Sequence, residues 1–127
     1  MSERGSMLPL LAVLIFVALT VTALAADVAT FAATYREVAF AADAGAEAGA
    51  GTIDPAAAYA GTLRIETSAA VGIATDAALR ARPRPERTAT ATADPNRVCV
   101  TVSQPFTPRF LPAATVTVTG CAEPRRG

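Results

Sequence analysis

The sequence has no histidine, no tryptophan and no lysine, and only seven of its 127 residues are aromatic. Without histidine, the Ser-His and Cys-His schemes of nucleophilic catalysis are excluded, and a zinc site could use only cysteines and carboxylates. The 11 basic and 11 acidic residues cancel to a net charge of zero, which argues against a protein that mainly binds nucleic acid. Because aromatic side chains carry much of the energy of a core, we expect one small domain with a thin core.

Paired carboxylates, which general acid–base catalysis would need, are also scarce. The acidic residues are scattered singly along the chain, and the i,i+4 pair of Asp43 and Glu47 is most simply a solvated helix face. We therefore expect a protein that is not an enzyme, with no cofactor, no metal, no small-molecule substrate and no nucleic-acid partner.

A long run without charge fills residues 5–26. A helix of this length spans about 33 Å at ~1.5 Å per residue, enough to cross the hydrocarbon core of a bilayer. The run predicts a cytoplasmic N-terminus at residues 1–6 and a transmembrane helix at residues 7–26. Arg4 before the run and Asp27 after it favour an N-terminus inside, which places the C-terminal region outside the cytoplasm.

A secretory signal peptide is the alternative interpretation of this run. Ala23, Leu24 and Ala25 have the small-x-small pattern of a signal peptidase site, and cleavage after Ala25 would release a secreted, soluble binding domain. Helical periodicity nevertheless continues beyond this point, in small or apolar residues spaced three and four apart. They are Val28, Phe31, Tyr35, Val38, Ala42, Gly45 and Gly49. This pattern predicts that the helix continues into an alanine-rich stalk over residues 27–51.

Small residues dominate the end of this predicted stalk. Spacings of four residues allow another helix to approach closely. The candidate helix-packing residues are Ala41, Ala42, Gly45, Ala46 and Gly49. We expect this stripe to pack against a helix of a sister protein; a fraying alanine-rich helix end is the simpler alternative.

Residues 52–81 predict a second helix. Asp54 is a candidate N-cap and Pro55 suits the first turn, and we expect a break near Thr67 and Ser68. Alternating prolines in residues 82–87 then exclude helix and predict a solvated linker that is rich in proline and arginine.

The chain changes character in residues 88–127, where short segments rich in valine and threonine alternate with turns. Residues 98–103 and 114–119 predict two antiparallel strands, and residues 88–93 supply a possible third. Together they form a small antiparallel hairpin or meander outside the cytoplasm. The predicted fold is therefore α+β, with a long membrane helix and stalk, a second helix and a small sheet.

The two cysteines are expected to form a disulfide; the alternative is a pair of buried thiols in a cytosolic protein. Cys99 lies near the start of one predicted strand and Cys121 just past the end of the next, where antiparallel partners meet. An even pair in a small exported domain is typical of a disulfide, worth roughly 3 kcal/mol for a loop of about 23 residues.

The loop between these two strands carries Phe106, Phe110 and Leu111 among prolines. These three side chains are candidates for contact with a protein partner; the alternative is that they fill the core beneath the sheet.

The order of these segments resembles a known family. Arg4 and Gly5 precede the apolar helix, Asp27 follows it, and an Arg-x-x-x-x-Ala-Ala-Asp-Ala block comes next, as in the TadE/TadG-like family of the tight-adherence (Flp/Tad) pilus assembly system. The residues that match the family's block are Arg36, Ala41, Ala42, Asp43, Ala44, Ala48, Gly49 and Ala50.

This resemblance implies a pilin-like fold and a pilus-assembly or minor pilin-like role in a bacterial cytoplasmic membrane. Its partners would be membrane lipid and other pilin-like or pilus-assembly proteins, contacted through helix packing. Gly5 and Ser6 match the bond that prepilin peptidase cuts. Leu10 stands where classical substrates carry glutamate, so an accessory protein that stays anchored is the expected form.

Overall fold

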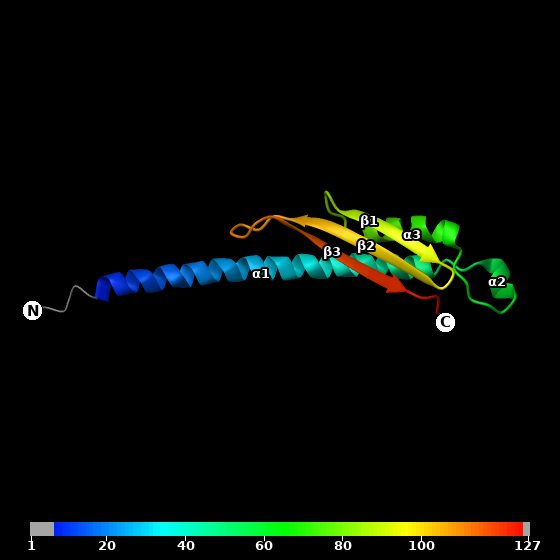
Figure 1. Ribbon diagram of the computed structural model, residues 1–127, viewed down its shortest axis with the longest axis horizontal. Coiled ribbons are helices and arrows are strands. Elements are labelled where there is room, and N and C mark those ends of the chain that lie inside the picture. The colour runs from blue at the N-terminus through cyan, green and yellow to red at the C-terminus, as the bar shows by residue number, and fades with distance from the viewer. Residues whose placement is uncertain (1–6, 126–127) are drawn as a thin grey trace, which may run out of the picture.

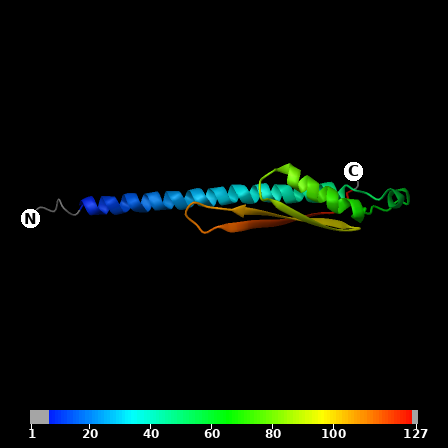
Figure 2. The same ribbon diagram turned by 90° about the horizontal axis from the view of Figure 1, so that it is seen from above.

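The computed structural model describes residues 7–125 and contains one long helix, two shorter helices and one sheet. The elements are α1 (Met7–Ala50), α2 (Pro55–Tyr59), α3 (Thr67–Ala81), β1 (Thr88–Asp94), β2 (Arg97–Phe106) and β3 (Ala114–Ala122). Figures 1 and 2 show α1 as a rod, with α3 and the sheet packed beside its C-terminal half and its N-terminal half bare. The predicted α+β class is confirmed.

The strands form an antiparallel meander in the order β1-β2-β3. Because side chains alternate along a strand, Val98, Val100 and Val102 share one face of β2, and all three are fully buried against the helices. The opposite face is polar: the hydroxyls of Thr101 and Thr119 lie 2.8 Å apart across β2 and β3.

The predicted disulfide is present between Cys99 and Cys121, which are directly opposite each other in the β2–β3 register. It closes a loop with a sequence separation of 22 residues. The bond therefore joins the two strands at the end of the hairpin that lies away from the connecting loop.

The small-residue stripe of α1 forms the centre of the core. Ala41, Ala42 and Ala46 are completely or almost completely buried, and their side chains face alanines of α3 and valines of the sheet. A Cβ added to Gly45 would lie 2.7 Å from the carbonyl oxygen of Ala74, so only glycine allows this approach of α3. The stripe thus packs against a helix of its own chain, because α3 and the sheet fill the space in which a sister helix was expected.

The segment between α1 and α3 differs from the predicted second helix. Asp54 caps α2 as expected, accepting a hydrogen bond from the amide of Ala56 at 2.9 Å. The helix then stops after five residues, and α3 begins at Thr67, where a break was predicted. Gly61 has a φ of +80°, and an antiparallel bridge joins Ile53 to Ile65. The segment that connects α1 to α3, which includes α2, therefore folds back on itself.

Candidate functional site

The N-terminal half of α1 is an apolar surface that the rest of the described chain leaves exposed, apart from a contact with the β2–β3 loop near Ala23 and Leu24. Every residue of 7–26 is exposed except Ala23, which is half-buried. The large exposed side chains in this segment are Met7, Leu8, Leu10, Leu11, Val13, Leu14, Ile15, Phe16, Val17, Leu19, Val21 and Leu24. The helix is long and apolar enough to cross a membrane, a property that it shares with signal sequences.

The two hydroxyl groups within this apolar segment are paired locally. Thr20 donates to the carbonyl of Phe16 and Thr22 to that of Ala18, each at 2.8 Å. Hydrogen bonds to the carbonyl four residues earlier remove the cost of placing a threonine hydroxyl in an apolar medium. The surface of residues 7–26 is therefore compatible with lipid along its whole length.

Asp27 marks the boundary between the bare and the covered parts of α1. Although it is charged, it is only 4% exposed. Its carboxylate accepts hydrogen bonds from three consecutive backbone amides of the β2–β3 loop, at 3.1 Å from Arg109, 2.8 Å from Phe110 and 3.2 Å from Leu111. Hydrogen bonds to a carboxylate are among the stronger ones in proteins. Asp27 therefore fixes the tip of the hairpin to α1.

The three apolar residues of the β2–β3 loop have different positions. Phe106 belongs to the core and makes an edge-to-face contact with Phe31 of α1, with ring centroids 5.6 Å apart. Phe110 is 63% exposed and Leu111 is 43% exposed. The expected partner surface is thus reduced to Phe110 and Leu111, and the core alternative holds for Phe106.

Phe110 extends the apolar surface of α1. Together with Phe16, Leu19 and Leu24 it lines a shallow groove, to which Thr20 and Ala23 also contribute. The tip of the β2–β3 loop therefore lies beside the last part of the apolar run, near Leu19 and Leu24.

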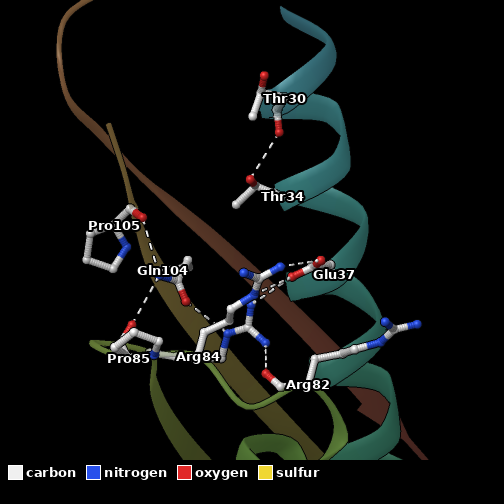
Figure 3. Close-up of polar contacts among 9 residues, drawn as sticks. Thr30, Thr34, Glu37, Arg82, Arg84, Pro85, Gln104 and Pro105 are labelled. Carbon is white, nitrogen blue, oxygen red and sulfur yellow. Dashed lines mark hydrogen bonds and ion pairs between the residues drawn. The ribbon is translucent and has the colours of Figure 1, made fainter. Parts of the chain in front are cut away.

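A polar cluster ties the segment between α3 and β1 to α1, as Figure 3 shows. Arg84 binds Glu37 through two nitrogens, with Nε 3.2 Å from Oε2 and Nη2 2.9 Å from Oε1. The side chain of Arg87 is almost fully buried, and its Nη2 lies 3.6 Å from Oε2 of Glu37. Its Nε donates to Oε1 of Gln104 at 3.1 Å, and its Nη1 donates to the carbonyl of Arg82.

Residues 82–86 are exposed and non-helical, in agreement with the predicted linker, but Arg84 and the buried Arg87 also bind side chains of α1 and β2, which the sequence did not predict. The hydrogen bond from Arg84 holds the pKa of Glu37 below its ordinary value against the opposing effect of burial, and Glu37 in turn raises the pKa of Arg84. A carboxylate held in its ionised form by arginine is a poor proton donor at neutral pH. We interpret the cluster as a structural tie.

The remaining sequence-based candidates give no further site. The proposed processing bond between Gly5 and Ser6 lies outside the described residues. Within residues 7–125, no three Cys, Asp or Glu side chains converge in a way that could hold a metal ion.

Comparison of the chain with protein-family models, with curated proteins and with solved structures finds no match.

Proposed function

We propose that this chain is a non-enzymatic, single-pass protein of a bacterial cytoplasmic membrane, anchored by residues 7–26, with residues 27–125 outside the cytoplasm. We further propose that it serves a tight-adherence-type system as a pilus-assembly or minor pilin-like protein. The observation that supports the anchoring is the exposed apolar half of α1. It continues without a break into the C-terminal half of the same helix, against which α3 and the sheet pack.

The energetic argument for a lipid environment follows from the exposed side chains of that half. Twelve large apolar side chains of residues 7–26 are 41–79% exposed. Removing a large apolar side chain from water is worth roughly 1.5–3 kcal/mol when burial is complete, so lipid would stabilise this partly covered set by on the order of 10–20 kcal/mol. Residues 27–125 leave these side chains exposed, including those that lie beside Phe110.

The disulfide supports the proposed orientation. Structural disulfides form and persist in oxidising compartments such as the bacterial periplasm and are rare in the cytosol. Cys99 and Cys121 both lie in the sheet that packs on the C-terminal half of α1, so they would share one side of the membrane. Arg4 on the other side of the apolar run agrees with an N-terminus inside.

The pilus role rests on the TadE/TadG-like sequence block. Because the small residues of that block hold α3 and the sheet, contacts with other pilus proteins would use surfaces that remain free, above all the apolar half of α1. Such an arrangement fits a subunit whose membrane helix meets the helices of its partners.

Two experiments test the proposal. Alkaline carbonate extraction of membranes tests the anchor: the chain is expected to stay in the pellet, and its release into the wash would contradict anchoring. Deletion of the gene in its host, followed by counting surface pili by electron microscopy, tests the role. We expect fewer pili and their return on complementation; unchanged pili would contradict the pilus role.

The second candidate function is a secreted binding domain, favoured by the Ala23, Leu24 and Ala25 pattern. In the structure these residues lie inside α1, and Ala23 and Leu24 line the groove beside Phe110. Cleavage after Ala25 would therefore have to occur before this part of the chain folds. A soluble exported form that begins at Ala26 would favour this candidate.

A further inference from the structure

We infer that the β2–β3 loop, residues 107–113, is a second membrane contact, which inserts Phe110 and Leu111 into the outer leaflet of the bilayer beside α1. This inference rests on the proposed anchoring of residues 7–26. The partner that contacts Phe110 and Leu111 is the lipid bilayer itself. The protein would then contact the membrane at two places, the helix of residues 7–26 and the β2–β3 loop. Two contacts would hold the outer domain at a fixed distance and orientation relative to the membrane.

The position of the loop along α1 is the first argument. Asp27, the first charged residue after the apolar run, binds the loop backbone and so places it at the expected membrane boundary. The groove that Phe110 lines includes Leu24 and Leu19, which lie roughly 5 and 12 Å before Asp27 along the helix axis. If residues 7–26 span the hydrocarbon core, the Phe110 ring falls within its outer leaflet.

The hydrogen bonds of the loop backbone are the second argument. An irregular segment is normally excluded from lipid because its unpaired N–H groups lose their water partners. Here Pro108 and Pro112 have no N–H, and the N–H groups of Arg109, Phe110 and Leu111 all donate to Asp27. The remaining amides are those of Thr107 and Ala113, next to the strands. Most of the loop's donors are thus satisfied without water.

The side chains at the tip fit the same environment. Phe110 and Leu111 are exposed, although burial in protein would be the usual state of such residues. Arg109 beside them is the one charged residue of the loop. Arginine can keep its guanidinium at the level of the phosphates while its aliphatic stem lies along apolar surface, so it agrees with a loop at the lipid interface.

The absence of tryptophan in this chain permits a direct test with single-tryptophan variants of the full-length protein. Phe110→Trp is the probe. Leu14→Trp, in the apolar run, reports insertion of the anchor. Tyr59→Trp, at a position 94% exposed in α2, reports water. Each variant is reconstituted in phosphatidylcholine vesicles, with bromine atoms placed either near the headgroup or near the end of the acyl chains, and fluorescence quenching is measured.

We expect the Phe110→Trp emission to be blue-shifted and quenched most strongly by bromine near the headgroup. Leu14→Trp should be quenched most strongly by deep bromine, and Tyr59→Trp only by aqueous iodide. Adding Asp27→Asn to Phe110→Trp should weaken the bromine quenching, because the NH2 group of asparagine cannot accept a hydrogen bond and only one uncharged oxygen remains for the three loop amides.

Three results would overturn the inference. If Phe110→Trp is quenched by iodide like Tyr59→Trp while Leu14→Trp is quenched by bromolipid, the anchor stands and the loop contact fails. If neither Phe110→Trp nor Leu14→Trp is quenched by bromolipid, the anchoring itself fails. If Phe110→Trp is blue-shifted, unquenched by bromolipid and sensitive to dilution of the protein in lipid, the loop contacts another copy of the chain and not lipid.

Discussion

The close approach of α1 and α3 leads to a sharp prediction about Gly45. A Cβ at this position would lie 2.7 Å from the carbonyl oxygen of Ala74, 2.8 Å from the Cβ of Ala78 and 3.3 Å from the Cα of Ala78. The oxygen and the Cα are backbone atoms of α3, and the Cβ is bonded directly to that backbone. A change of rotamer therefore cannot remove the clash, which requires a shift of α3.

The expected free-energy change for Gly45→Ala is the difference between two effects. Overpacking a close-packed interior costs about 1–3 kcal/mol, and backbone contacts of this kind place Gly45 in the upper part of that range. Replacing a helical glycine by alanine favours folding by about 1 kcal/mol. We therefore expect a net destabilisation of about 1–2 kcal/mol, which corresponds to a lower melting temperature by roughly 4–16 °C for a domain of this size.

Gly72→Ala is the matched control, because Gly72 lies within α3 and a Cβ there would meet nothing within 4 Å. The same helix-propensity gain should stabilise this variant by about 1 kcal/mol. The assay is thermal unfolding of the full-length chain in mild detergent, followed by circular dichroism. If Gly45→Ala proves as stable as Gly72→Ala, the tight contact between α1 and α3 is refuted.

The other predictions concern the disulfide, the ion pair and the loop. Cys99→Ser with Cys121→Ser should lower the free energy of unfolding by roughly 3 kcal/mol, and an unchanged unfolding curve of the non-reduced protein would contradict this. Since the hydrogen bond from Arg84 lowers the pKa of Glu37, the stabilisation from this pair is present above the ordinary carboxyl pKa and is lost as pH falls through the lowered value. Glu37→Gln should therefore destabilise the protein at pH 7 and reduce its acid sensitivity; identical pH–stability curves would argue against the pair. Asp27→Asn should increase hydrogen exchange at the amide of Phe110, and unchanged protection would show that the carboxylate does not hold the loop.

Local patterns predicted much of this fold. The spacing of small and apolar residues three and four apart predicted that the first helix continues to the end of α1. The N-cap at Asp54 predicted the start of α2. The positions of Cys99 near the start of one predicted strand and of Cys121 just past the end of the next predicted the disulfide, and the two residues are directly opposite each other in the β2–β3 register. Each of these features depends on neighbours in sequence or on a regular period.

The features that sequence reasoning missed depend on contacts between distant residues. The pair of Arg84 and Glu37 spans 47 positions, and Asp27 and Phe110 are 83 positions apart; no periodic pattern signals either one. A stripe of small residues also does not reveal whether the helix that approaches it belongs to the same chain. One signal was available for the loop: an isolated aspartate at the end of an apolar run, together with prolines flanking apolar residues.

The intact mass of the non-reduced protein extracted from cell membranes would show whether an anchor at residues 7–26 is joined to a disulfide-bonded outer domain. We expect a chain that retains residues 7–26, either at full length or cut after Gly5, with a mass two hydrogen atoms below that of the reduced chain. A chain that starts at Ala26 and lies in the soluble fraction, or a membrane chain with both thiols reduced, would contradict this expectation.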